Sequence, residues 1–315
     1  MTDQSPVVEV EDLVKRYKEV VALDHFDLRI AQGEIFGLLG PNGSGKTTAI
    51  NCILQLLTYS KGSVKLWGEP MTPTSYDLKR RIGIVPQQVA VMAELTVREN
   101  IDYFCSLYVA QAERRRELVD QAIAFVGLGE FASFRPKKLS GGLARRLNIA
   151  CGIAHQPELI FFDEPTVAVD PQSRNAILEG IRGLARDGAT IVYTSHYMEE
   201  VEQLCTRIMI MDHGRSVAVG TAAELKAATG IGERVEVELD IADDAALAAI
   251  LNLPNTQQAT LEGSTLRVDC ARGSQNLGDV LGALDAVGVG YGRVYSEPPT
   301  LNDVFLELTG TELRD

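Results

Sequence analysis

The chain has 315 residues, which suffices for about two domains at roughly 100 to 200 residues each. Hydrophobic residues make up 45% of it and charged residues 23%, a balance that argues against intrinsic disorder and fibrous repeats. With 30 basic side chains against 43 acidic ones the net charge is -13, so general binding to nucleic acid is not expected.

The cysteines lie far apart in the sequence and form no CxxC pair, at Cys52, Cys105, Cys151, Cys205 and Cys270. This pattern indicates neither a disulfide framework nor a zinc site, and it favours a reducing compartment. The first six residues show neither a basic nor an apolar leader segment, and no run of about 18 apolar residues occurs. We therefore expect a cytoplasmic protein that reaches a membrane only through a partner.

The N-terminal part of the chain has the pattern of a wound α/β layer. Residues 7–30 alternate apolar and polar positions, as half-buried antiparallel strands do, and residues 34–39 form a continuous apolar run, as a buried central strand does. A glycine-rich turn and a helix follow. Two more short apolar runs, 159–162 and 190–194, are separated by a helical stretch and predict a parallel sheet with crossover helices.

A mostly helical insertion is predicted between these strands. Residues 95–155 show helical periodicity and many Ala, Leu, Arg and Glu residues, with a break at 133–138. We assign residues 1–222 to a first domain, with a helical subdomain at about 89–156.

A second, smaller domain is predicted from residue 231 to residue 315. Residues 222–232 are rich in Ala, Lys and Gly, and residues 234–240 then alternate strictly, which predicts a strand with one solvent-facing side. The elements expected next are a helix at 243–253, a hairpin across 262–264, a helix at 277–287 and a strand near Val294. The order β-α-β-β-α-β is that of a ferredoxin-like domain.

A phosphate-binding loop is predicted between the buried strand 34–39 and the helix after it. The segment matches GxxxxGK[ST] and reads Gly40, Pro41, Asn42, Gly43, Ser44, Gly45, Lys46 and Thr47. Glycines let backbone N–H groups converge on an anion, and the helix N-terminus adds partial positive charge. Lys46 can reach the β- and γ-phosphates of a nucleotide, and the Thr47 hydroxyl can bind Mg²⁺. An ordinary glycine-rich turn is the alternative.

Two carboxylates, Asp163 and Glu164, follow the apolar run 159–162. The carboxyl ends of the strands are where an open α/β sheet binds its ligands. Asp163 can hold Mg²⁺, and Glu164 can orient and polarise the water that attacks a γ-phosphate. The alternative is a strand that ends in solvent-exposed acidic residues. The predicted phosphate-binding loop disfavours this alternative.

The sequence Leu139-Ser140-Gly141-Gly142 opens a predicted helix. The residues expected on one side of this helix are Leu143, Leu147, Ala150 and Ile153. Ser140 is suited to cap the helix, and the glycine N–H groups are free to face an anion. A capped surface helix without a ligand is the alternative.

Together these motifs resemble, in order and spacing, the nucleotide-binding ATPase subunit of ABC transporters. The phosphate loop, the LSGG element, the Asp-Glu pair and His196 after the run 190–194 carry the resemblance, which extends from about residue 7 to residue 220. It implies a P-loop ATPase fold with an antiparallel β subdomain and a helical subdomain. It also implies ATP and Mg²⁺ as cofactors and ATP hydrolysis as the activity.

The resemblance assigns further residues. Tyr17 is the expected aromatic platform for adenine, and a tyrosine on a strand surface is the alternative. Gln87, with Gln88 as the fallback, is the expected glutamine at the Mg²⁺ and water shell. His196 is the expected switch that hydrogen-bonds the γ-phosphate, and Asp170 is the expected aspartate of the loop that crosses to a partner subunit.

The resemblance also implies a homodimer. Ser140 and Gly142 are expected to contact the nucleotide bound to the other protomer. Gly141 and Thr48 are further residues expected to bind nucleotide. A monomer is therefore incomplete. The residues expected to carry catalysis are Glu164, His196 and Lys46, and those expected around Mg²⁺ are Thr47, Gln87 and Asp163.

Two positions depart from the family pattern. Leu143 stands where Gln is more usual, and we expect little loss of hydrolysis because the phosphate contacts fall to Ser140 and backbone N–H groups. The residues before Asp170 read Val-Ala-Val where Gly-Leu is usual. Ala168 does not favour a positive φ, so any cost is expected in the cooperation between protomers.

Residues 297–306 resemble the Pro-x-Leu-x-Asp-Val-Phe-Leu ending of the drug-resistance subgroup of these ATPases, which serves exporters and carries a small extra C-terminal domain. The same segment predicts a helix at 301–308 that packs Val304, Phe305 and Leu308 into the accessory domain.

We therefore predict an ATP-hydrolysing subunit that dimerises around two MgATP and drives a separate membrane permease. Export of drugs or other small amphiphilic or lipid-like molecules follows from the subgroup resemblance. The expected location is the inner face of the cell membrane, through the permease. A soluble ABC ATPase that acts on ribosomes or DNA is the alternative; such proteins usually duplicate the cassette, carry long coiled coils or need basic surfaces, none of which is visible in the sequence.

Overall fold

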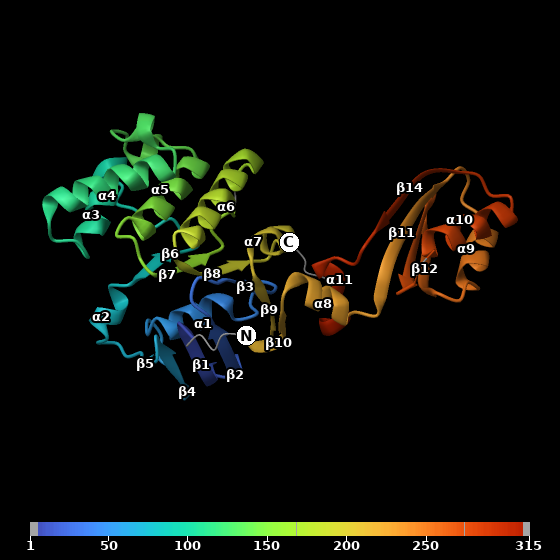
Figure 1. Cartoon of the computed structure of the whole chain (residues 1–315), viewed down its shortest axis with the longest axis horizontal. Coiled ribbons are helices and arrows are strands. Elements are labelled where there is room, and N and C mark those ends of the chain that lie inside the picture. Colours follow the sequence, from blue (N-terminus) through green and yellow to red (C-terminus); the bar gives the residue numbers. More distant parts are fainter. Residues whose placement is uncertain (1–5, 168, 274, 311–315) are drawn as a thin grey trace. The chain divides into compact units, whose positions relative to one another are not determined.

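The chain forms two compact units, which are described separately. The computed structural model describes residues 6–167, 169–273 and 275–310 and is shown in Figure 1. The first unit runs up to Thr221, and the second begins at Ala222. Within the described residues, no helix combines the length and the apolar character needed to cross a membrane.

A six-stranded sheet lies at the centre of the first unit, with the strand order β10-β9-β3-β8-β7-β6. Its strands are β3 (Ile35–Leu39), β6 (Ile82–Val85), β7 (Leu159–Asp163), β8 (Thr190–Ser195), β9 (Arg207–Asp212) and β10 (Arg215–Gly220). Neighbouring strands pair in parallel except β10, which is antiparallel to β9. Every residue of β3, β7 and β8 is buried, as the continuous apolar runs predict.

An antiparallel sheet in the order β2-β1-β4-β5 shares the core of the first unit. Its strands are β1 (Val8–Tyr17), β2 (Val20–Ile30), β4 (Lys61–Leu66) and β5 (Glu69–Pro70). Phe26 of β2, Phe36 of β3 and Ile50 of α1 (Lys46–Ile53) belong to one buried cluster. The predicted antiparallel strands between residues 7 and 30 are confirmed.

The predicted helical insertion consists of α3 (Val97–Ser106), α4 (Ala112–Phe125) and α5 (Gly141–Ile153). These helices pack against one another at the upper left of Figure 1. Thr96 begins α3 with a capping box, in which its hydroxyl accepts from the N–H of Glu99 and its own N–H donates to the Glu99 carboxylate. The remaining helical elements described in this unit are α2 (Tyr76–Lys79), the turns Gly129–Phe131 and Pro136–Lys138, α6 (Pro171–Arg186) and α7 (Met198–Leu204).

The second unit contains a four-stranded antiparallel sheet in the order β12-β13-β11-β14. Its elements are β11 (Ile231–Leu239), α9 (Asp244–Leu251), β12 (Thr256–Glu262), β13 (Thr265–Ala271), α10 (Asn276–Ala286) and β14 (Tyr291–Glu297). Both helices cover one face of the sheet, where Ile250 and Leu284 pack with Val237 and Val268. The succession of elements and the strand order confirm the predicted ferredoxin-like domain.

Two details of this unit differ from the sequence prediction. The two predicted domains do not include residues 223–230, whereas the structure forms α8 (Ala222–Ala228) there, because Ala, Leu and Lys favour a helix. The last helix is α11 (Leu301–Thr309), which packs against α8 and buries Val304 and Phe305 as predicted. Leu308 is 44% exposed instead of buried, since it lies in the final turn; Leu301 at the other end is buried.

Candidate active site

The loop Gly40–Gly45 joins the end of β3 to the start of α1. Two of its glycines are required by the backbone. A Cβ on Gly40 would lie 2.4 Å from the carbonyl oxygen of Met211, and Gly45 has φ +105° with a Cβ 2.7 Å from the carbonyl oxygen of Ala22. The backbone therefore passes closely at these two positions only because they carry no side chain, and the N-terminus of α1 follows directly, as an anion-binding loop requires.

Lys46, the first residue of α1, turns its ammonium group back toward the loop. Its Nζ donates to the carbonyl oxygens of Gly40 at 2.7 Å and Pro41 at 3.1 Å, and it lies 3.5 Å from Oε1 of Glu164. Burial lowers the pKa of Lys46, and the nearby carboxylates of Glu164 and Asp163 oppose that shift. The Ser44 hydroxyl oxygen is buried without a hydrogen-bond partner among the described residues, so the loop holds one polar atom that a phosphate can satisfy.

Asp163, the last residue of β7, is held by hydroxyl groups on both of its oxygens. Thr47 donates to Oδ2 at 2.9 Å, and Thr194 of β8 donates to Oδ1 at 2.7 Å. A hydroxyl and a carboxylate at one point are the hard oxygen ligands that Mg²⁺ prefers. The described residues contain no group of three or more His, Cys, Asp and Glu side chains suited to a metal ion. The donor set fits an ion such as Mg²⁺, which takes one or two protein ligands and completes its shell with phosphates and water.

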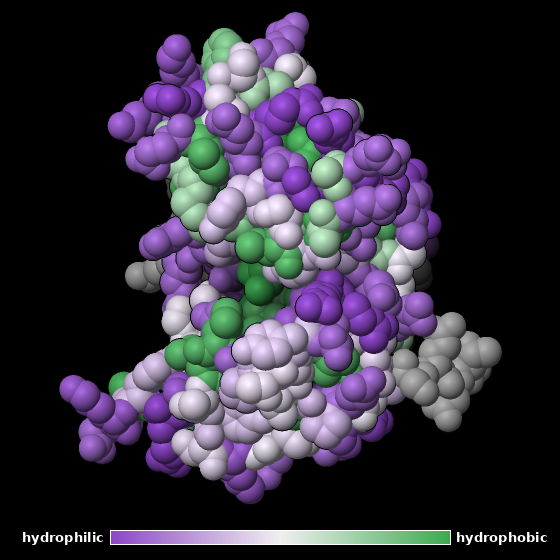
Figure 2. All heavy atoms as spheres, turned by 90° about the vertical axis from the view of Figure 1, so that its left-hand side faces the viewer, coloured by the Kyte–Doolittle hydropathy of each residue, from purple (hydrophilic) through white to green (hydrophobic). Residues whose placement is uncertain are grey.

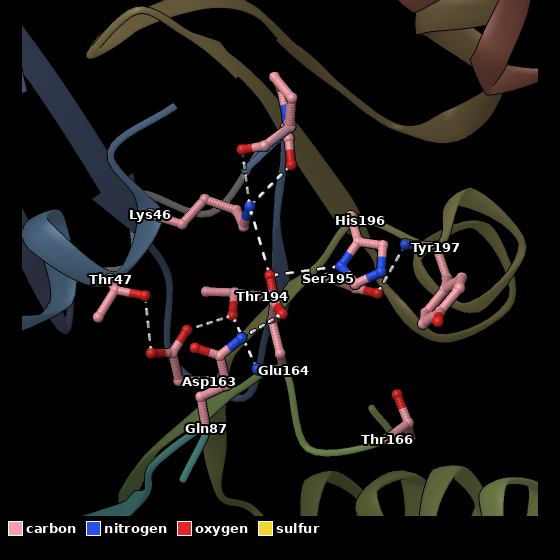
Figure 3. A network of polar contacts seen from close by, with 12 residues as sticks. Lys46, Thr47, Gln87, Asp163, Glu164, Thr166, Thr194, Ser195, His196 and Tyr197 are labelled. Carbon is pink, nitrogen blue, oxygen red and sulfur yellow. Dashed lines mark hydrogen bonds and ion pairs between the residues drawn. The ribbon is translucent and has the colours of Figure 1, made fainter. Parts of the chain in front are cut away.

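Glu164 is the centre of the polar network in Figure 3. Its Oε2 accepts from Nε2 of Gln87 at 2.8 Å, and its Oε1 lies 3.4 Å from Nδ1 of His196 as well as 3.5 Å from Lys46. The residue is 5% exposed and has φ +47°, a left-handed conformation that is uncommon outside glycine. Its N–H donates to the hydroxyl of Thr194 at 3.0 Å. The backbone of Glu164 is thus strained, and hydrogen bonds hold both its N–H group and its carboxylate in place.

Helix α5 holds the segment that carries Gln87. Arg145 donates to the carbonyl oxygens of Pro86 and Gln87, and Asn148 donates to Pro86 at 3.0 Å while accepting from the N–H of Ala90 at 3.0 Å. Burial lowers the pKa of Arg145. Of the two glutamines, both of which are exposed, Gln87 is the one that donates to Glu164.

The other predicted site residues lie outside this network. Tyr17 ends β1 with 43% of its surface exposed, and Nζ of Lys15 lies 4.7 Å from its ring centre. Ser140 begins α5, where it accepts from the N–H of Leu143 at 3.3 Å, which confirms the predicted cap. Asn42 and Gly43 of the loop are exposed, Thr48 of α1 is half-buried, and Gly141 of α5 is exposed.

Asp170 begins α6 and accepts from the N–H of Ser173 at 2.9 Å. Arg146 of α5 donates to the hydroxyl of Ser173 at 2.9 Å, so α5 and α6 are joined beside Gly142. Ala168, where the turn before Asp170 departs from the family pattern, lies outside the described residues. No hydrogen bond or ion pair among the residues described connects Ser140 with Lys46, Glu164 or His196.

The sequence prediction missed two groups that hold the site residues in place, Thr194 and Arg145. Thr194 binds both Asp163 and the backbone of Glu164. A signal for it was present, because hydroxyl residues at the end of the run 190–194 precede His196 and lie at the carboxyl edge of a parallel sheet.

Comparison with known proteins connects this site to a family. A family model described as "ABC transporter" matches residues 23–167, and one described as "ATP-binding protein DrrA1-3-like, C-terminal domain" matches residues 220–309. The linearmycin resistance ATP-binding protein LnrL of Bacillus subtilis is 35% identical over 98% of this chain and 100% of its own length. The chain belongs to the ATP-binding subunits of ABC transporters.

Other ABC ATP-binding subunits are equally similar. The daunorubicin resistance ATP-binding protein DrrA3 of Streptomyces coeruleorubidus is 36% identical over 98% of this chain and 97% of its own. The Nod factor export ATP-binding protein I of Ralstonia nicotianae is 35% identical over 99% of this chain and 96% of its own.

Solved structures show the same ABC ATPase fold. An ATP-binding cassette solved as a dimer in a post-hydrolysis state, bound to ADP and Pi, superposes with a TM-score of 0.64, 28% identity and coverage of 68% of this chain and 98% of that one. An ATP-binding subunit of an ABC transporter superposes with a TM-score of 0.65, 25% identity and coverage of 70% and 92%. The subunit is an ATPase, and the predicted family and fold are confirmed.

Proposed function

We propose that two copies of this ABC subunit enclose two MgATP, and that each site takes residues from both copies. The observation that carries the proposal is the division of the predicted site. Lys46, Glu164 and His196 converge within one copy, whereas Ser140 lies apart from them at the tip of α5. The dimeric cassette among the solved structures supports this arrangement.

In this proposal the residues of one copy hold the nucleotide and prepare hydrolysis. Lys46 exchanges its bonds to the Gly40 and Pro41 carbonyls for phosphate oxygens, and Thr47 and Asp163 hold Mg²⁺, which neutralises phosphate charge when bound. Glu164 orients the attacking water, with Gln87 donating to its carboxylate, and His196 hydrogen-bonds the γ-phosphate. Tyr17 receives the adenine ring.

The partner copy completes the site in this proposal. Ser140 and Gly142 contact the triphosphate from the opposite side, and Asp170 approaches the subunit boundary. Closure is then a consequence of nucleotide binding. Loss of the γ-phosphate removes the contacts that hold the copies together, and the subunits separate to move a permease.

A groove on the first unit supports docking of that permease. Figure 2 shows hydrophobic residues gathered in a hollow across the face that carries α3. A groove of about 250 Å³ is lined by Ile84, Pro86, Ala90, Phe104, Leu107, Tyr108, Asn148, Cys151, Gly152 and His155. Pro86 and Ala90 belong to the segment that carries Gln87. An amphipathic helix of the permease that binds in this groove therefore contacts the segment whose Gln87 donates to Glu164. We infer that the subunit is peripheral at the inner face of the cell membrane and serves export, as the names of its relatives support.

Leu107→Glu is the test of this docking. Leu107 is 59% exposed, so we expect a folded subunit with unchanged ATPase activity on its own and a loss of about tenfold or more in the fraction that sediments with cell membranes. Leu56→Glu, which places the same charge at a 61% exposed leucine outside the groove, is the matched control. Equal membrane sedimentation of both variants, or co-purification of the unaltered chain with ribosomes or DNA from detergent extracts, would contradict the transport proposal.

A further inference from the structure

Glu200 of α7 is a buried carboxylate that the proposed hydrolysis does not use. It is 3% exposed, and its Oε2 accepts from the hydroxyl groups of Thr166 at 2.8 Å, Tyr193 at 2.7 Å and Ser195 at 3.2 Å. Burial and the nearby carboxylate raise the pKa of Tyr193 well above its usual range, which keeps that phenol a donor. Three hydroxyl groups therefore donate to one carboxylate oxygen of Glu200, and carboxylate oxygens are strong acceptors.

The donors come from the two segments that carry predicted site residues. Thr166 lies between Glu164 and Asp170, and Ser195 directly precedes His196. The hydroxyl of Ser195 also accepts from the N–H of Tyr197 at 2.9 Å. One side chain therefore fixes the segment after β7 and the turn around His196 to the same point.

The second oxygen of Glu200 faces a cation. Its Oε1 lies 3.2 Å from Nε of Arg174 on α6, the helix that Asp170 begins. The Arg174 guanidinium lies 4.8 Å from the ring centre of Tyr197, whose ring is 4.2 Å from that of His196. Glu200 thus joins α6, α7, β8 and the segment after β7.

We propose that Glu200 is a positioning residue for hydrolysis, which holds His196 and residues 164–167 in one fixed arrangement. The inference rests on the proposed role of His196. Glutamine cannot replace Glu200. If the amide oxygen faces the three hydroxyl groups, the NH₂ group faces the guanidinium of Arg174, which is also a donor. In the opposite orientation the NH₂ group faces the three hydroxyl donors.

Glu200→Gln is the decisive variant. We expect turnover per ATP-binding site to fall about 10- to 100-fold, because the reacting groups lose their alignment. The affinity for a fluorescent ATP analogue should stay within about twofold, since Lys46, Thr47 and Asp163 are untouched. Glu199→Gln removes the same charge from the neighbouring, exposed position of α7 and should leave both quantities unchanged.

The readout separates positioning from a merely structural role. A structural role lowers the amount of protein that binds ATP and leaves the turnover per binding site intact, and that result overturns the proposal. If Glu200→Gln does not fold, Ser195→Ala tests the proposal, because it removes one of the three hydrogen bonds to Glu200. We expect turnover to fall about threefold or more at unchanged affinity for the ATP analogue. Unchanged turnover in this variant contradicts the proposal.

His196→Ala, measured in parallel, separates this inference from the proposed function. If His196→Ala keeps full turnover, the proposed role of His196 fails and the inference fails with it. If His196→Ala loses turnover and Glu200→Gln does not, the inference alone fails. Turnover of the double variant His196→Ala with Glu200→Gln should lie within about twofold of that of the slower single variant, because both changes act through His196.

Discussion

Glu164→Gln should lower the rate of ATP hydrolysis by about 10²- to 10⁴-fold, the usual contribution of a positioned general base. The carboxylate is buried and lies within contact distance of Lys46, Gln87 and His196. Glutamine has the same shape, so those neighbours stay in place while the group that accepts a proton from water is lost. ATP binding should therefore persist.

The measurement is phosphate release at saturating MgATP together with equilibrium binding of a fluorescent ATP analogue. Glu130→Gln, an exposed carboxylate outside the network, is the control for loss of one negative charge. Turnover within threefold of the unaltered subunit, at about equal protein stability, would remove Glu164 from the role of base.

Lys46→Ala should weaken nucleotide binding itself. The ammonium group is 5% exposed and is aimed at the phosphate loop by two carbonyl oxygens. Charge-assisted hydrogen bonds to phosphate are worth about 2 to 4 kcal/mol together, which corresponds to about 30- to 1,000-fold in Kd. Its removal also leaves Glu164 and Asp163 without their nearest cation, which further disfavours an anionic ligand.

Titration with the same fluorescent analogue measures this loss, and a thermal unfolding curve shows whether the variant is folded. Lys79→Ala provides the control, because Lys79 lies on α2, outside the phosphate loop, and its Nζ donates to the carbonyl oxygen of Pro73 at 2.8 Å. An unchanged Kd for Lys46→Ala in folded protein contradicts the assignment of the phosphate loop.

The two variants are expected to differ in whether they still bind ATP. Glu164→Gln is expected to separate binding from hydrolysis, whereas Lys46→Ala is expected to lose both. That contrast follows from the positions of the two groups, since Lys46 lies at the loop and Glu164 lies at the end of β7 across from it.

Local sequence was enough to predict the elements that carry the site. The run 34–39 and the Asp163-Glu164 pair could be placed because buried parallel strands are continuously apolar and end where ligands bind. The ferredoxin-like unit was predictable for a similar reason, since strict alternation in 234–240 and a glycine-centred hairpin are local signals. Each of these signals lies within a short stretch of chain.

The sequence could place Thr194 at the carboxyl edge of the sheet, but it could not predict the bonds of the network around the site, because these bonds join distant residues. Thr194 reaches back to Asp163, and Arg145 reaches Gln87 across most of the helical insertion. The hydroxyl partners of Glu200 lie close together because β7 and β8 are neighbours in the sheet, which the local sequence does not show. In α11 Leu301 is buried and Leu308 is exposed, although both lie on the face predicted from the helical period, because Leu308 lies in the final turn of the helix.

A structure of Glu164→Gln with MgATP tests the central proposal most directly. We predict two copies in which the triphosphate on Lys46 of one chain also contacts Ser140 and Gly142 of the other. A triphosphate bound elsewhere, or surrounded by residues of a single copy with Ser140 of the partner far away, contradicts the account.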